Sequence, residues 1–445
     1  MRDKHQKSNI FFTAKNKKST VSLALAIAMG LPMAALANES DEVKKLQQQV
    51  EELSRAVAKM EQAPRVKTKG GGLEVESEDG KKSFEMGGRF QLDYNRFDGA
   101  YNAKNDGATA SDLFPRRIRT YVEGQADNWD YKLLLDFSED KGEITLARLR
   151  YKGFENGPTI KLGKIREDIS LEALTSSKHI TAISRPMVAN VMSPYFKYGT
   201  SAYQYFESTG LRYAIGAYKG GSFGTDGQDE NGDMNLSVTG RLTWSPIHTK
   251  GKTLHFGAWG SQRDMGGDVL SENFARGEVR NTNVRLVNYA AGGETFAVDN
   301  MTQYGFEFAG VYGPLSLQGE YSVRDVDAME SFNDSSYDGY YVTASYFLTG
   351  ESRVYKKRGV FNSPTPIADS GAWEVFARIS QFDATSDTQG TVTEVLTVGT
   401  TYYLNKKIKF MVNYLISDVS GPGAEELVGE ITDGNALTAR VQYLF

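Results

Sequence analysis

The chain has 445 residues, of which 51 are Lys or Arg and 56 are Asp or Glu, for a formal net charge of −5. It contains no cysteine, which excludes thiol catalysis and zinc–thiolate sites, and none of its four histidines lies in an H-E-x-x-H pattern. We therefore expect no cofactor, no metal and no enzymatic activity. An acidic chain of this kind is also not expected to bind nucleic acid.

The N-terminus, residues 1–37, has the three parts of a secretory signal peptide. Lys15, Lys17 and Lys18 are basic, an apolar run begins at Val21, and small residues at 35–37 offer a cleavage site. The apolar run is shorter than the roughly 18–20 residues of a spanning helix. The sequence therefore predicts an exported protein, and the mature chain is more acidic than the precursor.

Residues 38–66 predict a helix followed by a linker. Apolar residues recur there at spacings of three and four, the seam of a coiled coil; they are Val43, Leu46, Val50, Leu53, Val57 and Met60. Pro64 and the glycines at 70–72 indicate the linker. We expect this helix to lie in the periplasm and to join subunits, and a lone amphipathic helix lying on the rest of the protein is the alternative.

From residue 67 onward the sequence predicts an all-β domain, a transmembrane antiparallel β-barrel of about sixteen strands. No mature segment has the roughly 18 consecutive apolar residues of a spanning helix. Polarity instead alternates with period two, as in 408–417 and 437–445. Short and long connections mostly alternate, which is typical of an outer-membrane barrel. One connection breaks this rule: residues 350–370, the long connection, should be a short turn.

Strand parity predicts which charges face the lumen, because a charge facing mid-bilayer lipid costs about 2–4 kcal/mol. Arg117 and Arg119 lie on one face of their strand, and Arg148 and Arg150 on one face of another. The acidic excess gathers in long loops instead, at 225–233, 323–338 and 423–433. The predicted pore is thus basic although the chain is acidic, unless facing acids balance these arginines.

The stretches 171–183, 340–357, 371–380 and 401–414 resemble the phosphate- and polyphosphate-selective porins of Gram-negative outer membranes, over roughly 83–445. The resemblance implies a homotrimer of sixteen-stranded barrels, set in outer-membrane lipid, that passes small inorganic anions. In the family's phosphate binders a lysine stands just before the Thr-Ser-Ser run. Here Glu172, Ala173 and Leu174 occupy that stretch, which implies weaker monophosphate binding.

The resemblance also implies a set of pore residues. Arg116 and Arg117 match the family's strand-borne arginine pair, and Ser176 and Ser177, beside Lys178, match the paired serines of a loop that narrows the pore. Other basic residues form a ladder above the pore and a lower cluster that folds back from the long connection: Arg276, Arg280, Arg285, Lys356 and Lys357.

Three other functions stay open on the sequence. A non-selective or cation-preferring porin is the main alternative. An outer-membrane hydrolase would need a Ser–His pair, for which His179 near Ser176 and Ser177 is the one hint. An adhesin would act through the acidic loops.

Overall fold

The structure is a computed structural model that describes residues 41–61, 65–69, 72–138, 142–221, 234–270, 273–329 and 332–445. The predicted signal peptide and the acidic loop at 225–233 lie outside these residues. The chain forms two compact units, Met1–Ala63 and Pro64–Phe445. None of the described helices is long and apolar enough to cross a membrane.

The first unit contains helix α2, Asp41–Glu61, which confirms the predicted helix. Three residues of the heptad seam, Leu46, Val50 and Leu53, are about half exposed or more. On the opposite face Arg55 and Glu51 form an i,i+4 ion pair of 2.7 Å. These three seam residues are therefore exposed within the first unit.

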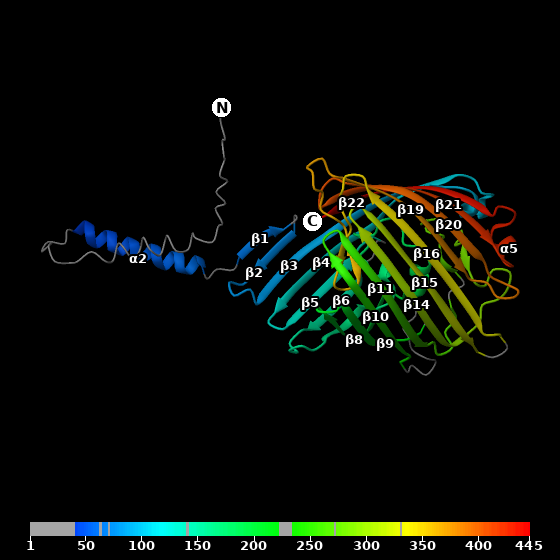
Figure 1. The fold of residues 1–445 in the computed structure, drawn as a ribbon, viewed down its shortest axis with the longest axis horizontal. Helices are drawn as coiled ribbons and strands as arrows, with labels where there is room; N and C mark the ends of the chain where they lie inside the picture. Colours follow the sequence, from blue (N-terminus) through cyan, green and yellow to red (C-terminus); the bar gives the residue numbers. More distant parts are fainter. Residues whose placement is uncertain are drawn as a thin grey trace, which may run out of the picture. The chain divides into compact units, whose positions relative to one another are not determined.

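The second unit is a closed barrel of sixteen antiparallel strands, which confirms the predicted fold class (Figure 1). Each strand pairs with the next along the chain, and β22 closes the barrel by pairing with β3. The strands are β3 Lys82–Phe97, β4 Ala110–Ala126, β5 Trp129–Asp136, β6 Glu143–Tyr151, β7 Thr159–Arg166, β8 Phe196–Phe206, β9 Leu211–Lys219, β10 Leu236–Thr249, β11 Lys252–Asp264, β14 Val298–Tyr312, β15 Leu315–Ala328, β16 Ser335–Phe347, β19 Ala372–Asp383, β20 Val392–Tyr403, β21 Ile408–Ser420 and β22 Asp433–Leu444.

The period-two pattern sorts side chains between lipid and lumen. Along β21 the apolar residues Phe410, Val412 and Tyr414 are exposed on the outer face. Lys409 and Asn413, between them, are buried in the interior. An open sheet edge would leave backbone groups unpaired in lipid, so closure by β22 and β3 satisfies the membrane's main constraint.

A short hairpin precedes the barrel and corrects the predicted linker. Its strands are β1, Arg65–Lys69, and β2, Gly72–Glu76. Strand β2 pairs with the start of β3, next to Gly88, whose backbone is hydrogen-bonded to that of Phe445 just after β22. In the sequence alone, glycines indicate a flexible linker. In the structure the start of β3, which extends beyond β22, provides the backbone groups with which β2 pairs.

Two long loops fold into the lumen. The waist loop, residues 167–195, holds α3 Leu171–Leu174 and α4 Met187–Met192. The arginine loop, residues 265–297, holds the short strands β12 Asn273–Ala275 and β13 Val287–Asn288. Outside them, the described connections include the 3₁₀ helix η1 Gly99–Asn105 and helix α5 Ala424–Val428.

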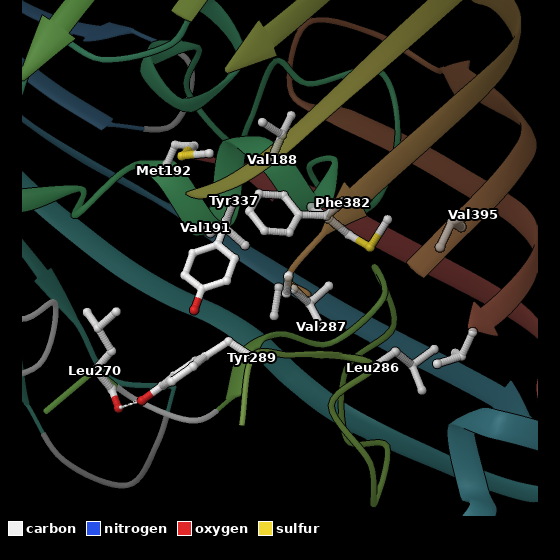
Figure 2. Packing of buried hydrophobic residues seen from close by; sticks show 14 of the residues in the cluster. Val188, Val191, Met192, Leu270, Leu286, Val287, Tyr289, Tyr337, Phe382 and Val395 are labelled. Atoms are coloured by element: carbon white, nitrogen blue, oxygen red, sulfur yellow. Dashed lines mark hydrogen bonds between the residues drawn. The ribbon is translucent and has the colours of Figure 1, made fainter. Parts of the chain in front are cut away.

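The two loops share one hydrophobic core with the inner face of the later strands. Figure 2 shows Val188, Val191 and Met192 of α4 beside Tyr337 of β16 and Phe382 of β19. From the arginine loop come Leu286, Val287 and Tyr289, and the Tyr289 hydroxyl donates to the Leu270 carbonyl at 2.8 Å. This core fills the lumen on the side of the later strands.

The long connection also folds inward. It forms a small hairpin of β17 Val354–Lys356 and β18 Val360–Asn362. Phe361 is fully buried, and its backbone N–H donates to the Thr175 hydroxyl of the waist loop at 3.3 Å. Inward folding explains why this connection departs from the short-turn pattern.

Candidate functional site

The lumen retains a cavity of about 520 Å³ on the side of the earlier strands. Seven consecutive strands, β3 to β9, form one wall, and the waist loop and the long connection form the other. Only two lining side chains are acidic, Glu123 and Asp168. Ten are basic: Arg89, Arg119, Lys132, Arg148, Arg150, Lys161, Arg166, Lys178, Arg212 and Arg358.

Strand register concentrates these charges. Lys132 of β5 stands directly opposite Arg148 of β6, and Arg150 stands opposite Lys161 of β7. Like charges directly opposite each other on a sheet are destabilising. An open, hydrated lumen and nearby carboxylates are what make this arrangement tolerable.

Nearby carboxylates pair with several of these cations. Asp130 contacts Arg148 at 3.0 Å, Arg150 at 2.8 Å and Lys152 at 2.6 Å. Asp136 pairs with Arg119 at 2.5 Å. These acids anchor the predicted residues Arg119, Arg148 and Arg150.

Glu123 and Asp168 do the same for other cations. Glu123 pairs with Lys132 at 2.7 Å, and Asp168 pairs with Lys161 at 2.6 Å and Arg212 at 3.1 Å. Burial alone would raise the pKa of Asp168, but Lys161 and Arg212 hold that pKa well below its usual value. Four carboxylates, counting Asp130 and Asp136 behind the lining, thus stand against ten cations, and the cavity keeps a positive excess.

The waist loop contributes Ser176, Lys178 and His179 to the lining. Burial lowers the pKa of Lys178, and neighbouring Arg89 and Lys132 lower it further. Among the described residues no carboxylate pairs with the Lys178 ammonium. Ser177, beside it, is buried, does not line the cavity, and has a hydroxyl without a hydrogen-bond partner among the described residues.

His179 is held in its neutral form. Its Nδ1 accepts a hydrogen bond from the Ser363 backbone N–H at 3.1 Å, which places the ring proton on Nε2. Burial, with Lys178 and Lys409 nearby, lowers the pKa of His179 to about 2. The ring contacts Ser363 of the long connection rather than Ser176 or Ser177.

Arg116 and Arg117 enter the lumen together because β4 carries a bulge. Gln91 of β3 pairs with Arg117 while Leu92 pairs with Pro115, which leaves Arg116 unopposed. Arg117 is buried outside the cavity lining and donates to Gln91 Oε1 at 3.0 Å. Gln91 in turn donates to the Ser177 carbonyl at 3.3 Å, so Arg117 supports the waist loop from behind.

The ladder residues Arg276, Arg280 and Arg285 are half-buried and lie outside the cavity lining. Asn95 of β3 donates to the Arg280 carbonyl at 2.8 Å, and the Arg280 charge acts on Arg116. The structure therefore brings Arg280 to the strand-borne arginine pair.

Glu278, the acid among them, is buried and ion-paired with Arg378 of β19. Burial raises the pKa of Glu278, and Arg378 opposes that rise. This pair ties the arginine loop to the barrel wall.

Lys356 and Lys357 correct one expectation. Both are exposed, and Lys357 pairs with Glu207 in the turn after β8. The next residue, Arg358, lines the cavity instead. The side chains of both lysines are exposed at the hairpin turn, so the inward fold of the long connection brings Arg358 to the cavity instead of the lysines.

Sequence reasoning missed several lining cations: Arg89, Lys132, Arg166, Arg212 and Arg358. Strand parity predicts that Arg89 faces the lumen, because it shares the buried face of β3 with Gln91 and Asp93. Arg358 has no such signal, because it lies in a connection whose inward folding depends on tertiary contacts.

A closed sixteen-strand barrel with a cationic passage is the architecture of a porin, a class of outer-membrane channels. The chain belongs to the family described as phosphate-selective porin O and P, whose sequence profile matches residues 84–445. It is 30% identical over 424 residues to Porin O of Pseudomonas aeruginosa, covering 85% of this chain and 92% of that protein.

Solved porins share the fold at low identity. An anion-selective porin from Comamonas acidovorans superposes with a TM-score of 0.52 at 11% identity, covering 82% of this chain and all of that one. OprB from Pseudomonas putida gives a TM-score of 0.50 at 10% identity, with 81% of this chain and 94% of that one covered. These likenesses show the barrel architecture alone.

Proposed function

We propose that the chain conducts inorganic oxyanions, such as phosphate, pyrophosphate and short polyphosphate, through the cationic cavity. The observation that carries this proposal is the ten basic against two acidic lining side chains. Fixed positive charge in a low-dielectric wall concentrates anions and raises the rate at which they enter. The same charge lowers the local concentration of cations and slows their entry.

Five predicted residues line the cavity and would contact the passing anion: Arg119, Arg148, Arg150, Ser176 and Lys178. Guanidinium groups can hold an oxyanion with two parallel hydrogen bonds. Asp130 and Asp136 already share the three arginines, which weakens each single contact. Conduction requires sites strong enough to select and weak enough to release.

The remaining arginines form the approach to the cavity in this proposal. Arg276, Arg280 and Arg285 lead anions inward along the arginine loop, and Arg116 continues their path beside Arg280. Arg117 is a positioning residue, because its guanidinium reaches the waist loop through Gln91 rather than the cavity. Ser177 acts in the same way through its backbone carbonyl.

Single-channel recording in a planar bilayer tests the proposal. Under a potassium chloride gradient we expect an anion-selective reversal potential, and chloride current that phosphate and pyrophosphate block. Phosphate block should be weaker than in a dedicated phosphate porin, because Leu174 stands near the serines where a lysine is expected. A cation-selective reversal potential would establish the cation-preferring alternative instead.

We also infer a homotrimer whose α2 helices associate in the periplasm. The exposed seam of Leu46, Val50 and Leu53 supports association between copies of the helix, whereas the number of three subunits rests on the family resemblance and not on the helix. Deleting 39–66 should lower the temperature at which the oligomer dissociates in detergent and leave single-channel conductance unchanged. Failure of the barrel to assemble would show that the helix is not an accessory oligomerisation element.

A further inference from the structure

Three leucines in the cavity are not explained by the passage of inorganic anions. Leu134 of β5 and Leu146 of β6 are direct cross-strand partners, and Leu174 lies at the end of α3 in the waist loop. All three line the cavity and all are half-buried. We call them the leucine strip.

Strand parity shows that the two strand leucines truly face the lumen. Leu134 shares its face of β5 with Lys132, and Leu146 shares its face of β6 with Arg148, both of which line the cavity. The neighbouring Tyr131 and Leu149 are exposed on the outer face. Among the described residues, the leucine strip joins none of the buried hydrophobic clusters. These side chains therefore present apolar surface to a passage that is otherwise charged.

The two aromatic rings of Phe196 and Tyr203 in the cavity lining are already occupied. The Arg166 guanidinium lies 4.9 Å from the ring centre of Phe196, and the Arg212 guanidinium lies 5.1 Å from that of Tyr203. The two rings act as supports for these arginines.

The leucine strip adjoins a group of cationic side chains. Leu134 also lines an adjacent recess of about 100 Å³ together with Arg89, Lys132, Ser176 and Lys178. The Lys178 ammonium has no carboxylate partner among the described residues. A cationic head site and an apolar wall thus lie side by side.

We infer that the pore selects organic oxyanions, small phosphate monoesters or carboxylates whose apolar body lies on the leucine strip while the anionic head binds at Lys178 and Ser176. This inference rests on the proposed anion conduction. Inorganic phosphate is fully polar, so contact with leucine does not strengthen its binding. An alkyl or aryl group binds more tightly there, because contact with leucine removes its apolar surface from water. A cavity of about 520 Å³ exceeds the need of a single phosphate and falls in the size range of small-molecule sites.

Block of chloride current by a graded series tests the inference. The blockers are inorganic phosphate, methyl phosphate, n-propyl phosphate and phenyl phosphate, with benzoate as the carboxylate counterpart of the last. In the unmodified channel the half-blocking concentration should fall as the apolar body grows, by up to roughly fourfold for each methylene fully buried. Phenyl phosphate and benzoate together show whether the head must be a phosphate.

The variant Leu134→Ser with Leu146→Ser should flatten this series and leave block by inorganic phosphate within about twofold. Leu348→Ser, at an exposed position in the turn after β16, is the matched control and should keep the slope. If the double variant assembles poorly, Leu174→Ser alone should reduce the slope.

The outcomes separate the two proposals. Equal block across the series in the unmodified channel, or a slope that survives in the double variant, overturns the organic-anion inference while anion conduction stands. Loss of block by every anion together with a cation-selective reversal potential overturns the proposed function itself.

Discussion

The earlier and later strands of the barrel both point arginines into the lumen, but the surroundings of those arginines differ. Along β3 to β9 the basic side chains outnumber nearby carboxylates and face an open cavity. Along the later strands several inward charges meet a loop. Arg378 pairs with Glu278, and Arg440 donates to the Ile183 carbonyl at 2.8 Å while pairing with Asp93 at 2.6 Å.

The later strands also supply inward acids that hold backbone groups. The Glu320 carboxylate of β15 accepts from the Leu171 N–H at 3.1 Å and the Glu172 N–H at 2.8 Å, which caps α3. Glu307 of β14 pairs with Arg241 at 2.6 Å, and Arg241 also donates to the Gly359 carbonyl of the long connection at 2.9 Å. Inward arginines of the later strands are thus tied to loops that fill the lumen, whereas those of β3 to β9 still line the cavity even where a waist-loop group pairs with them, as Asp168 does with Arg212.

The largest effect is expected from removing the ion pair that holds the arginine loop against the later strands. Arg378→Met leaves the buried Glu278 carboxylate without its cation, which costs about 3–5 kcal/mol. The arginine loop should detach, single-channel conductance should rise, and limited proteolysis should cleave within 265–297. Arg378→Met with Glu278→Gln should restore most of the docking, because removing both charges leaves neither unpaired. An unchanged conductance and cleavage pattern in the single variant would show that this pair does not hold the loop.

A smaller effect is expected on the open side from Lys178→Ala. Losing one charge-assisted hydrogen bond, about 1.5–3 kcal/mol, should raise the half-blocking phosphate concentration roughly tenfold or more at both low and high salt. Burial lowers the pKa of Lys178, so block in the unmodified channel should weaken with rising pH before ordinary lysines titrate. Lys357→Ala, at an exposed lysine outside the cavity, is the control. Equal loss in both variants would remove Lys178 from the selecting site.

Arg280→Ala tests whether Arg280 acts on the approach of the anion or on its binding inside the cavity. We expect slower anion access at low salt, measured as a reduced on-rate of phosphate block, with the off-rate unchanged. The effect should shrink in concentrated salt, since the Debye length falls to about 3 Å at 1 M. An effect on the off-rate that persists in high salt would make Arg280 part of the selecting site.

The smallest effect concerns His179. Because the pKa of His179 is lowered to about 2, the ring stays neutral in the folded channel between pH 4.5 and 8. Anion selectivity and phosphate block should show no step near the ordinary histidine value of about 6.5. His179→Gln, which keeps a neutral donor, should behave alike. A rise in anion selectivity on acidification that disappears in His179→Gln would show that the ring titrates.

The same pKa shift has a consequence for stability. The unfolded chain binds a proton at His179 below about pH 6.5, whereas the folded chain does not until about pH 2. The contribution of this group to folding stability is therefore fully present above pH 6.5 and declines as pH falls below it. His179→Gln should lessen the acid sensitivity of unfolding.

The amino-acid sequence by itself determined the class of protein. Alternation of polarity and of connection lengths was sufficient for a barrel of about sixteen strands, because lipid and lumen impose opposite polarity on successive side chains. The heptad spacing likewise predicted the helix at 41–61. Parity placed Arg119, Arg148 and Arg150 on the inner face, which is a local property of each strand.

Only the tertiary structure decided what each inward charge does. The bulge in β4 turns Arg116 inward beside Arg117, and the hairpin of the long connection brings Arg358 rather than Lys357 to the cavity. The segment at 65–69, predicted as linker, becomes a strand only because β2 lies beside it. Parity tells which face a side chain takes, but whether that face meets water, a carboxylate or a folded loop depends on residues far away in the chain.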